Sequence, residues 1–231
     1  MHLTKLIKTA LPEANFLAFV SIILLIAKIF IFNRIPEIVP GAYELGVLSD
    51  AILTSVVASY LFYLLVVHLK EQSDKEAVRP YIAKHAKRIV GDCEALLSEL
   101  SKKSGTPLEL ISTKDKIESA LKNIAPDSDA PLLTPSLGRH ANWPELFFYR
   151  NTRTKESCRK LLDQLPLLDA KLIGLVAAID DCSLFIQVQM VLSMPFDNSD
   201  MTFFTTSLHG YTDLCAKLDA FVKNSDLSNA P

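Results

Sequence analysis

The sequence predicts an all-α membrane protein in which a hairpin of two transmembrane helices precedes a cytoplasmic helical bundle. Apolar stretches at residues 16–32 and 51–67 predict the hairpin, because about 20 such residues cross a hydrocarbon core of about 30 Å. The remainder of the chain is poor in glycine and repeats apolar residues at helical spacing, which predicts the bundle. Four parts are therefore expected in chain order: a hairpin at 1–70 with spans at about 16–32 and 51–69, juxtamembrane helices at 71–124, a linker at 125–141 and a C-terminal bundle segment at 142–231.

The distribution of basic residues predicts the orientation of the two spans. Lys5 and Lys8 precede the first span, and a basic segment from Lys70 to Arg88 follows the second, whereas the intervening loop carries Arg34 alone. Because basic residues stay on the cytoplasmic side, both termini are expected in the cytoplasm. The first apolar stretch begins too late and is too long for a cleaved signal peptide, so it is expected to remain as a span.

Two features of the spans are candidates for function. Lys28 lies near the outer end of the first span and Asp50 begins the second at the same end, so Lys28 is expected either to snorkel to the outer interface or to pair with Asp50; a pore-lining role for Lys28 is the alternative. Ala51, Ser55 and Ser59 follow one another at intervals of four residues, and small residues at this spacing let helices approach closely. This face either packs against the first span or joins several hairpins into a homo-oligomer.

Four segments of the cytoplasmic part carry apolar stripes typical of bundle helices. Each stripe contains one cysteine, and the four thiols are expected to be free core residues in a reducing compartment. Asn142, Pro144 and Glu145 predict a helix start. Residues 167–194 are apolar enough to raise the question of a third span, but the central Asp180 and Asp181 argue against it. The predicted stripes are Ile82, Ala86, Ile89, Cys93, Leu96 and Leu100; Phe147, Cys158, Leu161 and Leu165; Leu168, Leu172, Leu175, Ile179, Cys182 and Ile186; and Phe204, Leu208, Tyr211, Cys215, Leu218 and Val222.

Motifs of catalysis, cofactor binding or metal binding are not found, so no enzymatic activity, cofactor or metal is expected. Two basic clusters remain. The cluster of Lys84, Lys87 and Arg88 is expected to face anionic lipid and set the topology. The second cluster follows three aromatic residues and is the candidate contact for nucleic acid or an acidic partner, with a solvated helix face as the alternative. It consists of Arg150, Arg153, Lys155, Arg159 and Lys160.

In size and layout, with a hairpin over residues 16–67 and a helical cytoplasmic domain, the chain resembles the two-span membrane effectors that accompany some retron reverse transcriptases in bacterial antiphage defence. This resemblance implies a toxin of the bacterial inner membrane that its reverse transcriptase and the DNA–RNA product hold inactive. Release would damage the membrane, and the cluster at 150–160 would then contact the nucleic acid. A membrane-anchored scaffold or signalling adaptor is the competing interpretation, and a channel or transporter subunit, which would have to oligomerise, is a third.

Overall fold

The computed structural model describes residues 7, 10–31, 41–134, 138–193, 199–225 and 227. The chain is mostly helical, at 80% helix, and its described part contains two short strands. It divides into two compact units, Met1–Ala77 and Val78–Pro231. The division falls inside helix α4 (Leu69–Ser104), so residues 78–124 and 142–231 belong to one unit. The all-α class expected from the sequence thus holds for all but the short strands.

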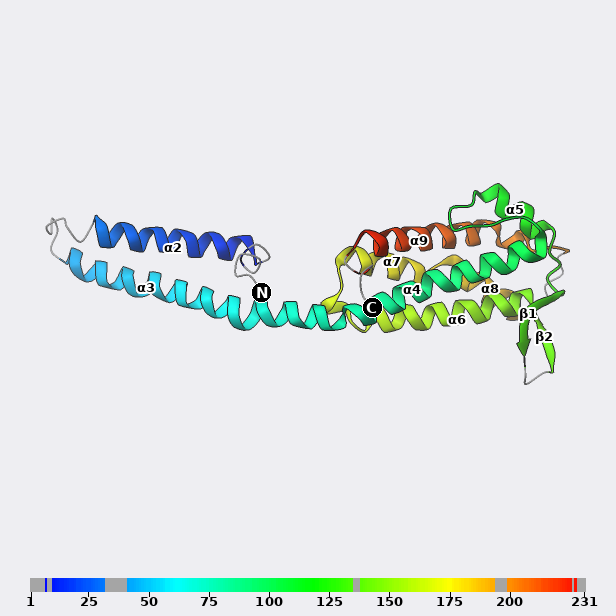
Figure 1. Cartoon of the computed structure of the whole chain (residues 1–231), viewed down its shortest axis with the longest axis horizontal. Coiled ribbons are helices and arrows are strands. Elements are labelled where there is room, and N and C mark those ends of the chain that lie inside the picture. Colours follow the sequence, from blue (N-terminus) through cyan, green and yellow to red (C-terminus); the bar gives the residue numbers. More distant parts are fainter. Residues whose placement is uncertain are drawn as a thin grey trace. The chain divides into compact units, whose positions relative to one another are not determined.

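The first unit is built on two helices, α2 (Pro12–Phe30) and α3 (Ala42–Phe62), which pack against each other in opposite directions (Figure 1). A π-helical segment, Tyr63–His68, follows α3 directly and leads into α4. Pro12 occupies the first turn of α2, where its missing N–H is not needed. The loop between the two helices lies largely outside the described residues.

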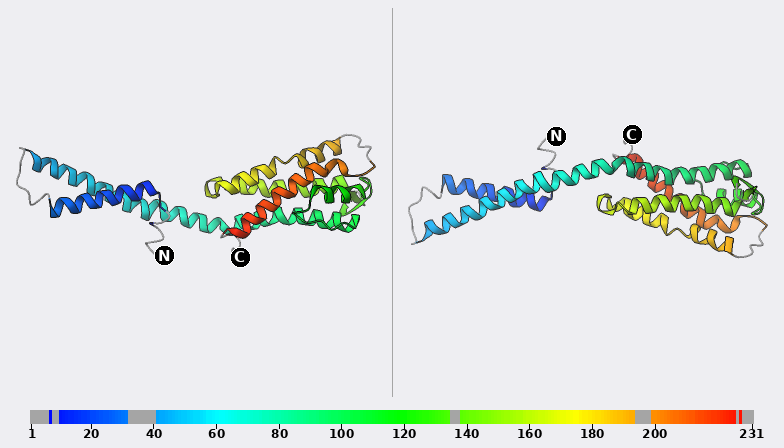
Figure 2. Two further views of the ribbon diagram at one scale, coloured as in Figure 1. Left: turned by 90° about the horizontal axis from the view of Figure 1, so that it is seen from above. Right: turned by 90° about the horizontal axis from the view of Figure 1, so that it is seen from below.

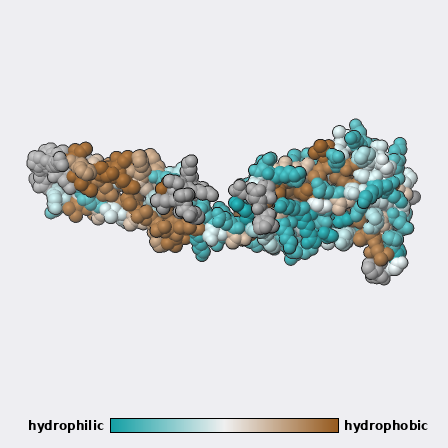
Figure 3. Space-filling model, viewed as in Figure 1, coloured by the Kyte–Doolittle hydropathy of each residue, from teal (hydrophilic) through white to brown (hydrophobic). Residues whose placement is uncertain are grey.

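Large apolar side chains cover the outside of the first unit (Figure 3). Phe16, Phe19 and Phe30 on α2 and Leu45 and Phe62 on α3 are all more than 60% exposed. A contiguous apolar surface of this kind marks contact with lipid or with other protein. Among the described residues, three segments are long and apolar enough to cross a membrane: Pro12–Phe30, Tyr43–Ser104 and Ala170–Ser193.

The second unit is a helical bundle (Figures 1 and 2). Its long helices are α4, α6 (Trp143–Leu162) and α9 (Thr205–Asn224), and the shorter α5 (Lys114–Lys122) packs on α9. The apolar segment near the C-terminal end forms two helices, α7 (Ala170–Asp180) and α8 (Ser183–Ser193), each of which contacts both α6 and α9. Short 3₁₀ turns occur at Leu165–Leu167 and Thr202–Phe204.

The predicted apolar stripes form most of the core of this bundle, with three corrections. Leu175 of α7 is only half-buried, and its neighbour Val176 is buried in the core instead. All predicted stripe residues of α4 and α9 are buried, and all four cysteines are free and buried. Ile186, however, is 58% exposed, because the break between α7 and α8 shifts the helical phase and buries Phe185 and Val188 instead. Leu165 is 47% exposed, because α6 ends at Leu162 and Leu165 lies in the turn that follows.

The segment expected to be a linker, 125–141, contains two strands that the sequence did not predict. Strands β1 (Asp129–Thr134) and β2 (Arg139–Asn142) pair in antiparallel fashion with an irregularity in register. Ala130 is buried and Leu132 packs on the core, whereas Leu133 is 60% exposed, which is the two-residue alternation of a strand. Gly138 takes a φ of +63°, a conformation that glycine adopts without strain.

The helix start predicted at Asn142 is confirmed. The Asn142 side chain accepts a hydrogen bond from the Glu145 backbone N–H at 2.9 Å, and the Glu145 carboxylate accepts one from the Asn142 N–H at the same distance. This reciprocal capping box satisfies two N–H groups at the start of α6. The Arg139 guanidinium on β2 lies 2.6 Å from the Glu145 carboxylate and lowers the pKa of that carboxyl. This ion pair links the two strands to α6.

Candidate functional site

An ion pair connects α2 to α3 near one end of their contact. The Lys28 ammonium lies 2.5 Å from a carboxylate oxygen of Asp50 and also donates to the Gly46 carbonyl. A Cβ atom at Gly46 would lie 3.2 Å from the Lys28 nitrogen, so glycine leaves the room that this approach requires. The pair, one of the outcomes expected from the sequence, is therefore formed. Because the Lys28 side chain is only 17% exposed, it is directed at α3 rather than away from the helix pair.

A hydrogen bond holds the opposite end of the same pair. The Tyr60 hydroxyl on α3 donates to the Asn15 side-chain oxygen on α2, and the Asn15 amide donates to the Ile7 carbonyl at 2.8 Å. Polar groups in an apolar setting strongly favour having partners. The two polar contacts, one near each end, therefore fix the register of α2 against α3.

The small-residue face of α3 does not contact α2. Ala51, Ser55 and Ser59 are all exposed, whereas the half-buried positions Leu53 and Val56 lie on another face of the helix. Within the described part of the chain, the hydroxyls of Ser55 and Ser59 make no hydrogen bond. The sequence left open whether this face packs against the first span or joins several hairpins. In the structure it does not pack against the first span.

The π-helical segment that follows α3 was not foreseen. Its terminal residues, Tyr63 and His68, place their rings 6.0 Å apart and nearly parallel, and His68 is buried. A π-turn inserts an extra residue into the helical repeat, and such turns are frequent at functional positions. It shifts the phase of the side chains between the apolar α3 and the polar α4.

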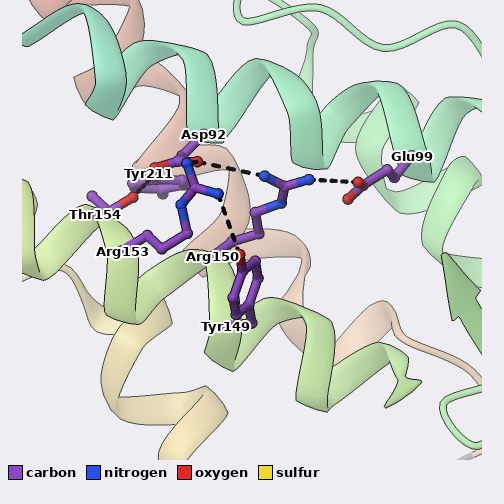
Figure 4. A network of polar contacts seen from close by, with 7 residues as sticks. All are labelled: Asp92, Glu99, Tyr149, Arg150, Arg153, Thr154 and Tyr211. Atoms are coloured by element: carbon purple, nitrogen blue, oxygen red, sulfur yellow. Dashed lines mark hydrogen bonds and ion pairs between the residues drawn. The ribbon is translucent and has the colours of Figure 1, made fainter. Parts of the chain in front are cut away.

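The second unit contains a network of arginines and carboxylates between α4 and α6 (Figure 4). Arg150 contacts Asp92 at 3.4 Å and Glu99 at 2.6 Å, and Arg153 contacts Asp92 at 3.2 Å. The Asp92 side chain is only 4% exposed. Arg153 also donates to the Tyr149 hydroxyl at 3.3 Å. Asp92 is thus a buried carboxylate shared by two guanidinium groups.

This network divides the basic cluster that was the candidate contact for nucleic acid or an acidic partner. Arg150 and Arg153 turn toward the carboxylates of α4. Lys155 lies over the Phe185 ring at 5.5 Å, Lys160 pairs with Glu156 on its own helix, and Arg159 is exposed. The five residues therefore do not form one surface. Sequence reasoning missed Asp92 and Glu99; their spacing of seven residues, which places both on one face of α4, was the available signal.

No group of three or more potential metal ligands occurs in the residues that the structure describes. Comparison of the chain with protein-family models, with curated proteins and with solved structures finds no match. The features that bear on function are therefore the α2–α3 pair, the buried ion-pair network between α4 and α6, and the charged residues around that network.

We predict that Asp92→Ala destabilises the second unit by about 3 kcal/mol, because it leaves two arginines in a buried site without their shared carboxylate. The measurement is denaturant unfolding of the full chain in detergent, followed by the fluorescence of Trp143, which is the single tryptophan and is fully buried. Glu156→Ala is the matched control, because it breaks an exposed pair within one helix. Equal unfolding midpoints for Asp92→Ala and the wild type would exclude a stabilising network.

We also predict that acid weakens the second unit through His85. Burial, and then the cations Lys160, Arg88 and Lys84, lower the pKa of this imidazole, while Glu156 opposes them. The unfolded chain therefore binds a proton on His85 at a higher pH than the folded chain, and stability falls as pH drops below the ordinary histidine pKa of about 6.5.

The test compares Trp143-monitored unfolding at successive pH values in the wild type and in His85→Gln, which cannot take up the proton. The wild type should lose stability more steeply than the variant as pH falls from neutral. Parallel pH profiles for the two proteins would contradict the prediction.

Proposed function

We propose that this protein is a membrane-embedded effector, a toxin of a bacterial antiviral defence system, whose two-helix hairpin perturbs the inner membrane when a partner complex releases it. The observation that carries the proposal is the exposed face of Ala51, Ser55 and Ser59 on α3. In hydrocarbon, small residues and hydroxyls favour contact with another helix over contact with lipid. Because α2 is not that helix, a second copy of the hairpin is the proposed occupant.

The proposed layout has two spans, α2 and α3. Their outward apolar side chains match a lipid environment, and Lys28 is neutralised by Asp50. The third apolar segment, Ala170–Ser193, is assigned to the cytoplasmic bundle. It is broken into α7 and α8, and Leu172, Val176, Leu184 and Val188 from it are buried in the core of the second unit.

The proposed mechanism follows from the number of spans. Two helices do not enclose a conducting path, so damage requires several hairpins to associate through the α3 face. A partner complex that keeps the copies apart would keep the protein inactive. A reverse transcriptase with its DNA–RNA product is the partner class that the resemblance in layout favours.

A groove favours a membrane-anchored adaptor as the second candidate function. It has a volume of about 650 Å³ and lies in the second unit, between α4, the segment after it and α9. Leu97, Leu108 and Ile111 supply apolar lining, Glu94 and Lys223 supply charge, and Ile111 is 81% exposed. Such a groove could receive a protein partner without any action on the membrane.

We predict that both termini are cytoplasmic. A membrane-impermeant thiol reagent applied to intact spheroplasts should label Ala42→Cys, the first residue of α3 at the end that follows the loop, and should not label Ser73→Cys. The four native cysteines are buried and provide little background. Labelling of Ser73→Cys with Ala42→Cys protected would reverse the topology.

We predict that Ser55→Leu reduces depolarisation of the inner membrane after induction, because a bulky side chain keeps the helices apart. Ser55→Ala removes the hydroxyl but preserves close approach, so it should retain most of the effect. Leu61→Phe enlarges an exposed position of α3 that lies about 120° round the helix from Ser55, and it serves as the control. The measurement is a potential-sensitive dye, with expression matched by blot and insertion checked by alkaline extraction. If the wild type leaves the potential unchanged, both alone and after phage challenge, the effector proposal fails and the adaptor takes its place.

A further inference from the structure

The fold brings two basic clusters, which are far apart in the sequence, to one end of the bundle. The contacts between α4 and α6 run in antiparallel order: Glu99 and Asp92 of α4 meet Arg150 and Arg153 of α6. Further along the same seam, His85 lies within electrostatic range of Lys160 and Glu156. The part of α4 around His85, within the second unit, therefore lies beside the C-terminal half of α6. We call five cations of this region the basic end patch: Lys84, Lys87, Arg88, Arg159 and Lys160.

The charge of the basic end patch is largely uncompensated. Glu156 pairs with Lys160 at 2.5 Å. Among the described residues, no ion pair involves Lys84, Lys87, Arg88 or Arg159, and the Arg88 Nε is buried without a hydrogen-bond partner. At the other half of the seam, by contrast, Asp92 and Glu99 neutralise two arginines. One pair of helices thus has a neutral half and a strongly basic half.

An aromatic side chain accompanies the basic half. The Tyr81 ring packs edge-on against His85, with centroids 4.5 Å apart, and remains 40% exposed. Tyrosine beside lysine and arginine is typical of the headgroup layer of a membrane, where an apolar ring with a polar tip is favoured. The patch also begins shortly after the second apolar span in the chain.

We propose that the basic end patch binds anionic lipid headgroups and docks the second unit on the bilayer that holds the hairpin. This inference rests on the membrane location proposed above. A headgroup surface is always close to a segment tethered to that membrane, which raises its effective concentration over that of a free polyanion. Each lysine or arginine near an anionic surface contributes substantially to binding.

Nucleic acid is the less favoured occupant of the patch. Binding of single strands combines cations with aromatic rings on which bases stack. Tyr81 is one exposed ring beside the patch, whereas the exposed rings of α6, Phe148 and Tyr149, lie near its start, about 15 Å along the helix from Arg159. The arginines nearest to those rings are already paired with Asp92 and Glu99.

The test uses the full chain in phosphatidylcholine vesicles with or without phosphatidylglycerol. A fluorophore is attached at Gly91→Cys, an exposed position of α4 with open space around it, and a nitroxide is attached to a fraction of the headgroups. Phosphatidylglycerol should increase quenching, and high salt should abolish the increase by screening. Combining Lys84→Gln, Lys87→Gln and Arg159→Gln should lower the docked-to-undocked ratio by about 100-fold.

The matched control combines Lys102→Gln, Lys103→Gln and Lys116→Gln, which removes the same charge from exposed positions outside the patch and should leave quenching unchanged. Equal quenching with and without phosphatidylglycerol, in protein that resists alkaline extraction, overturns the docking inference alone. Protein that alkali extracts overturns the membrane location as well. Binding of a single-stranded oligonucleotide that the patch variant loses, without any lipid preference, assigns the patch to nucleic acid and overturns the inference.

Discussion

The seam between α4 and α6 depends on one buried carboxylate. Asp92 is almost inaccessible to water, yet it faces two guanidinium groups, so neither helix can leave the other without exposing unpaired charge in a partly apolar setting. The Thr154–Tyr211 hydrogen bond, at 3.1 Å, continues polar contacts from α6 to α9. Charge at this seam therefore specifies which helices pair, while the apolar stripes supply the burial.

The first unit uses the same principle in an apolar setting. Its helices bury little against each other, so the Lys28–Asp50 pair and the Tyr60–Asn15 hydrogen bond fix their register. The remaining exposed surface of α2 and α3 is mostly apolar, and the hydroxyls of Ser55 and Ser59 are among its polar groups. Lipid tails contact the apolar side chains favourably, but they offer no hydrogen-bond partner to the serine hydroxyls. The hydroxyls of Ser55 and Ser59 lack hydrogen-bond partners in the helix pair, and this is the physical reason to expect association of hairpins.

Periodicity in the sequence was sufficient to predict most of the bundle core. The Lys28–Asp50 pair was one of the outcomes expected from the position of both residues at the same end of the two apolar stretches. Stripes in α4 and α9 were correct because each helix is unbroken over the stripe, whereas Ile186 was misplaced because Asp181 ends α7 and resets the phase. The strands at 129–142 were not predicted because prolines in this segment are typical of a linker. The division of the basic cluster could not be predicted, since it depends on carboxylates about 55 residues away in the chain.

The apolar segment Ala170–Ser193 is long and apolar enough to cross a membrane, yet part of it is buried in the core of the second unit. Near the bilayer centre, Asp180 and Asp181 would each cost about 3 kcal/mol, while each large apolar residue returns only about 0.5 kcal/mol. In the bundle, the same two aspartates lie at the break between α7 and α8 and Asp181 caps the end of α7, while Val176 and Ile179 reach the core. The break thus places the charges at the surface and the apolar residues inside, an arrangement that an unbroken membrane helix could not provide. Burial of this segment in the bundle and the cost of its two aspartates in lipid are the physical reasons for the two-span layout that we propose.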